Sequence, residues 1–388
     1  MRALVPALLL ALTGPGAPAG AESSAARRAD RIIAVGILAS APSATFRPSG
    51  AFKAIDQATG ELVSLVSGRD YPVEAESVAA KPGLVFGPHL MKGPARLLPG
   101  GPDDFVSIGA RKYRGNLVFR PNPDGTLTVV DELGLEEYLF GVLPHEMSPD
   151  WPLEALKAQA VVSRTFALNS LGKHEAAGFD LTDDTLSQVY TGLTTESERV
   201  RQAVRATAGE TLSWRGKPLR VYFHSTCGGH TSDPAEVWGG DSDAPLAGVK
   251  DRWCKASPHY RWEAYFPRTD IVAALNRNGL TVAQLLDVRE GRRGRAGWLK
   301  ELRLKTEAGW SRVSANQFRR WLGTKDLKSV RFEAIRERRK GFDFEGRGYG
   351  HGVGLCQWGA RGQAEAGRDY EQILALYFPG ADLEQAGE

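Results

Sequence analysis

The amino-acid sequence predicts an α+β fold, with short strands and helices mixed and a mainly β N-terminal region. Short runs of β-branched and aromatic residues, separated by Gly and Pro clusters, fill residues 31–130. Longer runs with apolar residues at helical spacing begin only after that region. The strands and helices of the second part follow no regular βαβ rhythm, which disfavours a doubly wound parallel sheet.

The N-terminal region ends in a clear hairpin pattern. Asp124-Gly125 separates the apolar run 116–120 from the run Leu127–Val130. An Asp-Gly pair between two such runs favours a tight turn, because its residues tolerate positive φ. Earlier strands are expected at residues 32–38, 45–49, 61–65, 84–86 and 105–108.

A long helix is the central element of the second part. Asp150 is its candidate N-cap, Pro152 fits the first turn, and Gly172 can close its end. A short helix at 135–141 is expected to precede it. Further helices are predicted at 315–322, 359–366 and 370–378.

Glu146 lies just before the long helix, in a Pro-flanked segment that is expected to hold its carboxyl group on a rigid support. The sequence allows two interpretations. The carboxylate can be a partner of the helix dipole or cap. It can instead be a general acid/base, with a pKa raised by the neighbouring apolar residues Met147 and Trp151.

The N-terminal segment and the charge of the chain indicate its expected localisation and its class of partner. Residues 1–21 have the pattern of a secretory signal peptide, and no later segment is apolar enough to span a membrane. We therefore expect an exported protein of the periplasm or cell envelope, with a mainly β part at 22–130 and a catalytic domain at 131–380. The formal net charge of +3 is too small to indicate nucleic acid as a partner. A basic segment at 288–340 holds 17 Lys and Arg against 6 Asp and Glu, which indicates an acidic wall polymer, a phospholipid surface or simply a solvated face.

The chain has only three cysteines, Cys227, Cys254 and Cys356. A Cys227–Cys254 disulfide and small buried apolar side chains are both compatible with the sequence. His224, Cys227 and His230 have zinc-ligand spacing, with Cys254 as a candidate fourth ligand. We nevertheless predict no metal and no cofactor.

Four sequence blocks, in this order, resemble the SpoIID/LytB family of stage II sporulation protein D-like lytic transglycosylases and amidase enhancers. They are Leu143–Thr165 (LPHEM…WPLEALKAQAVVSRT), Gln188–Gly192 (QVYTG), Tyr222–Thr231 (YFHSTCGGHT) and Gly348–Ala360 (GYGHGVGLCQWGA). The resemblance spans roughly residues 130–380.

The resemblance implies an exported peptidoglycan lytic transglycosylase that cleaves between N-acetylmuramic acid and N-acetylglucosamine. Glu146 first protonates the glycosidic oxygen, then acts as base while the muramic 6-hydroxyl attacks its own C1. The product is a 1,6-anhydro sugar. Hydrolytic glycosidases commonly need two carboxylates, but an internal nucleophile removes the need for the second. The alternative is a non-catalytic wall-binding enhancer of an N-acetylmuramoyl-L-alanine amidase. The expected partners are glycan strands and, in the alternative, such an amidase.

Seven further residues are candidates for substrate binding. Lys157 and Arg164 lie on one helix face and can hold an acidic glycan or pair with acidic side chains. The amide and phenol groups of Gln188 and Tyr190 suit sugar hydroxyls, although Tyr190 can equally be core. Alternating glycines in the last block let another element approach closely. Three more candidates can therefore face a saccharide, His351, Gln357 and Trp358, although Trp358 can equally be a packing residue.

The sequence departs from the family at one site. Some members bind zinc through Cys and His in and just before the QVYTG block, where this chain has Thr182, Leu186 and Ser187. These side chains cannot form that site, so activity is expected to survive chelators.

Overall fold

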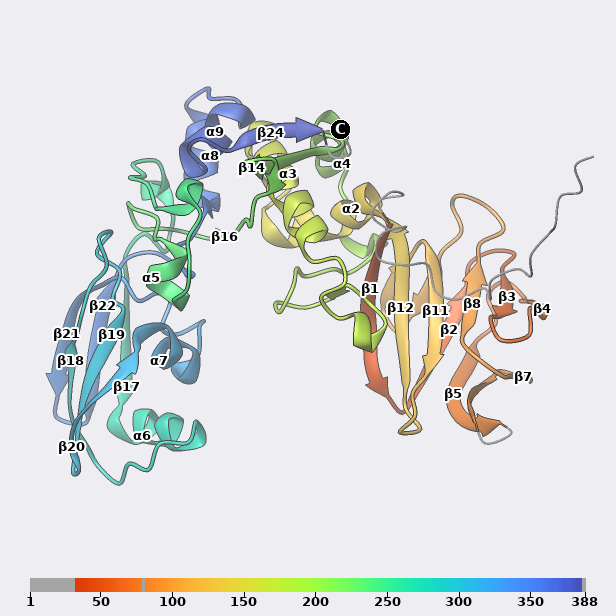
Figure 1. Ribbon diagram of the computed structural model, residues 1–388, viewed down its shortest axis with the longest axis horizontal. Coiled ribbons are helices and arrows are strands. Elements are labelled where there is room, and N and C mark those ends of the chain that lie inside the picture. The colour runs from red at the N-terminus through yellow and green to blue at the C-terminus, as the bar shows by residue number, and fades with distance from the viewer. Residues whose placement is uncertain (1–31, 79–80, 386–388) are drawn as a thin grey trace, which may run out of the picture.

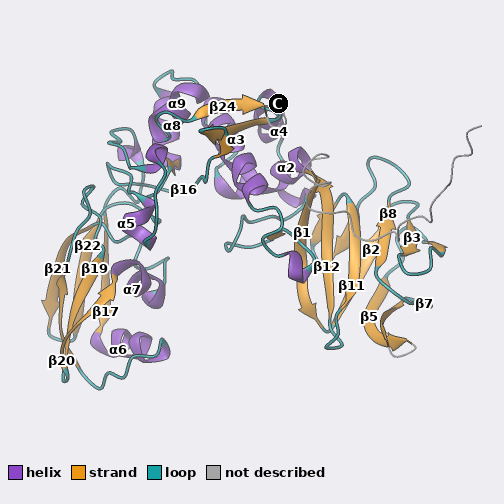
Figure 2. Cartoon of the chain, viewed as in Figure 1, coloured by secondary structure: helices purple, strands orange, loops and turns teal. Residues whose placement is uncertain are grey.

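The computed structural model describes residues 32–78 and 81–385. The predicted signal peptide at 1–21 lies outside the described residues. The α+β prediction is confirmed, including the β-rich N-terminal region. The chain forms an arch, with a β region at each end and most of the helices across the top (Figures 1 and 2).

Two sheets build the N-terminal region and share one hydrophobic core. Phe46 and Phe86 of the second sheet pack on Phe119 of the first, with ring centroids 5.1 and 5.5 Å away. The first sheet has the order β13 (Leu181–Thr182), β1 (Ile32–Ala41), β12 (Leu127–Gly134), β11 (Asn116–Pro121), β8 (Ala95–Leu98), β3 (Lys53–Asp56) and β4 (Leu62–Ser64). The second has the order β10 (Arg111–Tyr113), β9 (Val106–Ile108), β2 (Ser43–Pro48), β5 (Tyr71–Val78), β6 (Lys81–Phe86) and β7 (His89–Met91).

The predicted hairpin is confirmed as the antiparallel pair β11–β12. Gly125 adopts a φ of 81°, and the Asp124 carboxylate accepts the backbone N–H of Thr126 at 3.0 Å. The turn chemistry and the apolar runs therefore agree on one register.

Helices α2 (Leu135–Glu146) and α3 (Leu153–Asn169) form the centre of the arch. The expected helix 135–141 was too short, because α2 continues through Pro144 to Glu146. Proline costs a helix one N–H donor, and the buried Val142 and Leu143 keep the last turn packed. Asp150 is not the N-cap of α3.

Pro152 occupies that N-cap position, with an extended backbone. The residue before a proline disfavours the α conformation, so α3 cannot begin at Asp150. Around α3 pack α4 (Glu198–Ala206), α8 (Gln357–Glu365), α9 (Tyr370–Tyr377) and the sheet of β14 (Glu210–Trp214), β15 (Lys217–Pro218) and β24 (Asp382–Gln385).

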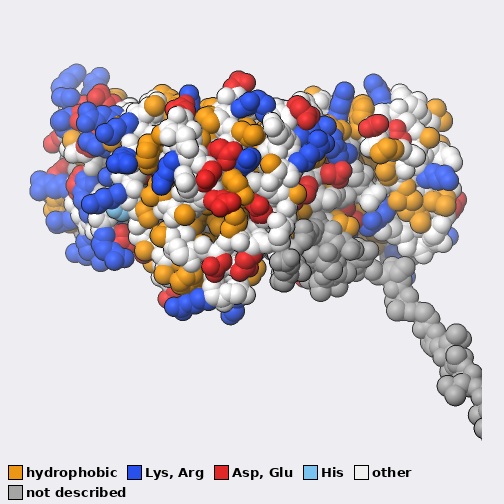
Figure 3. All heavy atoms as spheres, turned by 90° about the horizontal axis from the view of Figure 1, so that it is seen from above, with side chains coloured by type: hydrophobic (Ala, Val, Ile, Leu, Met, Phe, Trp, Pro, Cys, Tyr) orange, Lys and Arg blue, Asp and Glu red, His pale blue; other side chains and the backbone are white. Residues whose placement is uncertain are grey.

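The other end of the arch has a hydrophobic core of its own. Residues 131–380 therefore build two further cores besides the one that α2 and its neighbours share with the N-terminal sheets. The elements of this end are β17 (Trp262–Pro267), α6 (Arg268–Arg277), β18 (Leu285–Glu290), β19 (Glu301–Thr306), β20 (Gly309–Ser314), α7 (Ala315–Leu322), β21 (Phe332–Arg338) and β22 (Gly341–Gly346). The basic segment 288–340 lies here, and Lys and Arg side chains crowd this end in Figure 3. Several of them form exposed ion pairs with acidic side chains of the same region.

Within the described residues, none of the helices combines the length and apolarity needed to cross a bilayer.

Candidate functional site

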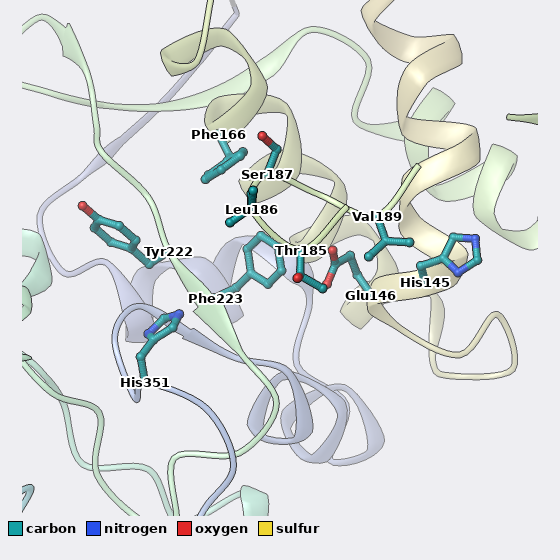
Figure 4. Close-up of a pocket in the computed structure, with 10 residues that line it drawn as sticks. All are labelled: His145, Glu146, Phe166, Thr185, Leu186, Ser187, Val189, Tyr222, Phe223 and His351. Carbon is teal, nitrogen blue, oxygen red and sulfur yellow. The ribbon is translucent and has the colours of Figure 1, made fainter. Parts of the chain in front are cut away.

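A cleft of about 400 Å³ opens beside the C-terminal end of α2. Its walls come from separate parts of the chain: the end of α2, Phe166 on α3, the segment 185–189, the pair Tyr222–Phe223 and His351. Figure 4 shows the Glu146 carboxyl group turned into the cleft beside Thr185. Among the residues lining the cleft, all in the described part of the chain, Glu146 is the single carboxylate.

Glu146 is the last residue of α2. Burial raises the pKa of its carboxyl group to about 7, and a hydrogen bond with the Gln357 side chain opposes part of that rise. The negative end of the α2 dipole also disfavours a charge at this position. Glu146 therefore holds its proton at mildly acid pH and can still release it near neutrality, as a residue with both an acid and a base role requires.

His145 lines the cleft, but its imidazole does not face the Glu146 carboxyl group. Its ring points away from the Glu146 carboxyl group in Figure 4. Its Nε2 lies 2.7 Å from the Thr191 hydroxyl and 2.9 Å from that of Thr195. These contacts tie the end of α2 to the short helix η2 (Leu193–Thr195).

The glycine-rich block forms the wall opposite Glu146. A side chain at Gly350 (φ 117°) or Gly354 (φ 71°) would collide with His224 Cβ at 2.7 Å or the Tyr222 carbonyl oxygen at 2.1 Å. The expectation of close approach is confirmed at these positions. The approach lets β16 (Phe223–His224) pair in parallel with β23 (Leu355–Cys356).

His351 projects from this block toward the cleft. Burial, with a smaller contribution from the neighbouring His224, lowers the pKa of its imidazole to about 3. The ring is therefore neutral at physiological pH. Its Nδ1 lies 3.0 Å from the Val353 backbone nitrogen and accepts that N–H, which places the ring proton on Nε2. The ring also hydrogen-bonds to the Phe223 backbone, so both of its nitrogens have partners within the chain.

An aromatic platform, made of Tyr222, Trp238 and His351, extends the cleft. The Trp238 ring lies 4.9 Å from Tyr222 and 5.1 Å from His351 between centroids. Trp238, the last residue of α5 (Pro234–Trp238), remains 45% exposed. An exposed indole beside neutral polar rings offers an apolar face to a ligand.

Two of the predicted binding residues have acidic partners outside the cleft lining. Arg164 is fully buried and makes a bidentate ion pair with Glu136 at 2.7 and 2.8 Å. Lys157 pairs with Glu154 at 2.7 Å. Both contacts favour the interpretation in which these cations have structural partners.

Gln188 and Tyr190 are also buried away from the cleft. The Tyr190 hydroxyl donates to Asp131 at 2.8 Å, and Gln188 accepts a hydrogen bond from Tyr138 at 3.3 Å. Both lie in the core between α2 and the first sheet. Trp358 is partly buried against Trp151, with a centroid distance of 5.1 Å.

Of the predicted site residues, the structure brings together Glu146, His351 and Gln357. Sequence reasoning missed the walls formed by Phe166, Phe223 and the segment 185–189. The sequence held one signal for this wall, because Leu186 is an apolar residue within a polar stretch. In the structure its exposed fraction is 74%. At the position of the family's zinc site, the Thr182 hydroxyl instead lies 3.1 Å from that of Ser187.

The chain was compared with known proteins and with models of protein families. The family model described as "Stage II sporulation protein" (SpoIID) matches residues 123–214, which include Glu146. Stage II sporulation protein D of Bacillus subtilis is 30% identical over 300 residues, covering 72% of this chain and 83% of the relative. The chain belongs to the SpoIID family. A second model, a domain of unknown function (DUF8618), matches residues 246–354 of this SpoIID protein.

Two other relatives show how far the similarity extends. An uncharacterized protein of Brachyspira hyodysenteriae is 36% identical over 281 residues, covering 72% of this SpoIID protein and 74% of the relative. A protein named amidase enhancer, from Bacillus subtilis, is 27% identical over 289 residues, but the match covers only 40% of its length.

Proposed function

We propose that this SpoIID protein is a peptidoglycan lytic transglycosylase with Glu146 as its acid and base. The observation that carries the proposal is a carboxyl group with a pKa of about 7 in a cleft where the described lining holds no second carboxylate. A hydrolase of the common two-carboxylate type needs a second acidic residue to activate water or attack the sugar. Attack by the substrate's own 6-hydroxyl does not.

The geometry supports one order of steps. Protonated Glu146 donates to the glycosidic oxygen as the bond to the muramic C1 breaks. The resulting carboxylate is stabilised by the Gln357 hydrogen bond, and it then takes the proton of the 6-hydroxyl as that oxygen closes on C1. The proton count balances, no water is consumed, and Glu146 is protonated again at the end.

The Tyr222, Trp238 and His351 platform supports a saccharide site next to the acid. Its rings provide apolar faces, and the hydrogen bonds of His351 to the Val353 and Phe223 backbone hold that ring in place. The cleft therefore combines apolar contact with few polar groups, as ligand sites commonly do.

A second function is favoured by one relative, whose name is amidase enhancer. In that case the cleft binds glycan strands without cleaving them and stimulates a separate amidase. Its prediction differs at Glu146, because binding alone does not need a transferable proton.

Zymography on purified wall distinguishes the two functions. The transglycosylase clears glycan by itself, and Glu146→Gln abolishes most of the clearing, since one group serves both proton transfers and each acid/base role contributes about 10²–10⁴-fold. The enhancer clears wall only when an amidase is added. Glu365→Gln, an exposed carboxylate change on α8, is the matched control and is expected to retain full activity.

A further inference from the structure

Three cysteines and an aspartate meet in the second core, outside the cleft. Among the described residues, the side-chain ligand atoms of Cys227, Asp251, Cys254 and Cys356 all lie within 4.8 Å of one another, and all four residues are buried. They come from a loop after β16, from the turn leading into the short helix η4 (Cys254–Ala256) together with the first residue of that helix, and from the end of β23. The cleft chemistry uses none of them.

The ligand atoms lie close to the separations of a tetrahedral ion: the sulfur–sulfur distance from Cys227 to Cys254 falls within that range, and the Cys227–Asp251 distance is a few tenths of an ångström shorter. Cys227 Sγ lies 3.6 Å from Cys254 Sγ and 3.1 Å from an Asp251 carboxylate oxygen. Bond lengths of about 2.3 Å to sulfur and about 2.0–2.2 Å to oxygen place tetrahedral ligand atoms roughly 3.4–3.8 Å apart. All three thiols are free.

Hydrogen bonds already orient the ligands. The backbone N–H groups of Gly229 and Cys227 point at sulfur, with nitrogen 3.3 Å from Cys227 Sγ and 3.2 Å from Cys356 Sγ. The Asp251 carboxylate accepts the Trp253 N–H at 2.7 Å and the Tyr377 hydroxyl at 3.1 Å. Such outer partners fix ligand direction in metal sites.

We propose that Cys227, Asp251, Cys254 and Cys356 bind one zinc ion in a closed structural site. Thiolate ligands in tetrahedral geometry favour zinc over the hard cations that prefer oxygen. The three thiols release their protons as the ion binds. The guanidinium of Arg331 donates to the carbonyl oxygens of Cys227 and Gly228, which places a positive charge beside this electron-rich cluster.

The assignment departs from the expectation of no metal, and it also differs from the His-x2-Cys-x2-His spacing. His224 and His230 are not in the cluster: the Nδ1 of each faces a backbone carbonyl oxygen, at 3.0 Å from Val353 and 2.8 Å from Thr231. Cys227 belongs to both sets, and so does Cys254, which the sequence offered as a candidate fourth ligand.

The ion would fasten together three segments that are far apart in sequence. Cys356 directly precedes Gln357, whose side chain hydrogen-bonds to Glu146, so the site is joined in sequence to a partner of that carboxyl group. The proposal does not depend on the transglycosylase assignment, because metal binding is measured without any activity.

The test begins with the full chain purified without chelator or reductant. Elemental analysis should find one zinc ion per chain. After the zinc is removed, titration with Co²⁺ should produce the thiolate-to-cobalt charge-transfer bands and intense visible bands of a tetrahedral site. Tyr377→Phe keeps every ligand and should weaken Co²⁺ affinity about 10- to 100-fold. Cys254→Ser should abolish the charge-transfer signature or greatly reduce it.

His230→Ala is the control and should retain the zinc and the cobalt spectrum. A metal-free wild type that fails to bind added Co²⁺ overturns the proposal. So does mass spectrometry that finds a Cys227–Cys254 disulfide in the purified chain, or a His230→Ala variant that loses the metal while Tyr377→Phe binds normally. Each readout uses wild type or a mild variant, so misfolding of Cys254→Ser leaves the outcome decidable.

Discussion

Replacing Glu146 by Gln should stabilise the protein at high pH and change little at low pH. Burial raises the pKa of the folded-state carboxyl group from 4.5 to about 7. Between these values the folded protein holds a proton that the unfolded chain has released, so wild-type stability falls as pH rises through the window. The stabilising contribution of the protonated Glu146 carboxyl group is complete below pH 4.5 and is lost as the pH rises through about 7.

The size of the effect follows from the same interval. At about 1.36 kcal/mol per pKa unit, the difference between 4.5 and about 7 corresponds to about 3 kcal/mol. This is a ceiling, because Glu146 is only partly buried and water screens its charge. The amide of Gln is nearly isosteric and cannot ionise, so the variant is free of this cost.

Urea unfolding of the wild type and of Glu146→Gln measures this difference in stability, once at a pH well below 4.5 and once at a pH well above 7. The expected result is a gap in unfolding free energy that opens only at the higher pH. Glu365→Gln changes an exposed carboxylate, and its unfolding free energy should differ from that of the wild type by less than about 1 kcal/mol at both pH values. A gap of equal size at both pH values, or a less stable Glu146→Gln at the higher one, would refute the argument that burial keeps this carboxyl group protonated.

Three further predictions concern neighbouring groups. Gln357→Leu should raise the pKa of Glu146 by roughly one to two units, because a hydrogen bond to a charged group contributes about 1.5–3 kcal/mol; the alkaline limb of the kcat/KM profile then moves to higher pH. Arg164→Ala should cost about 3–5 kcal/mol of stability, since it leaves Glu136 without its buried partner, as a thermal melt will show. Trp238→Ala should raise KM with little change in kcat, because it removes a saccharide contact and no proton-transfer group.

Each of these has a control in the same molecule. Gln363→Leu changes another buried amide on α8 and should leave the pH profile in place. Lys157→Ala removes a partly exposed ion pair and should cost less than about 1 kcal/mol. Trp310→Ala, an exposed indole on β20, should leave KM unchanged. Wild-type stability in Arg164→Ala together with a higher KM would instead make Arg164 a glycan ligand.

Local patterns predicted most of the N-terminal strands and the hairpin at Asp124-Gly125, because strand alternation and turn chemistry act over few residues. They were weaker at helix ends. The expected helix 135–141 ends before Pro144, yet buried neighbours carry α2 through that proline to Glu146. The three-part arrangement was not visible either, since separate hydrophobic cores form from contacts distant in sequence.

In the candidate site, too, local sequence patterns were informative and contacts between distant segments were not predictable. Glu146 was identifiable because its own surroundings carry the signal, and alternating glycines pointed to the wall that bears His351. Gln188 and Tyr190 have side chains suited to sugars, but only tertiary packing reveals that they face Tyr138 and Asp131. The cysteine cluster was missed for a similar reason: Cys356 lies more than a hundred residues from its neighbour Cys227.

The most direct test of the central claim is mass spectrometry of the products formed from defined glycan strands. We predict fragments ending in 1,6-anhydromuramic acid, with no solvent oxygen incorporated when the reaction is run in ¹⁸O-labelled water. Reducing-end products that carry the label would contradict the account, because they require an activated water and therefore a second catalytic group that the described lining of this cleft does not provide.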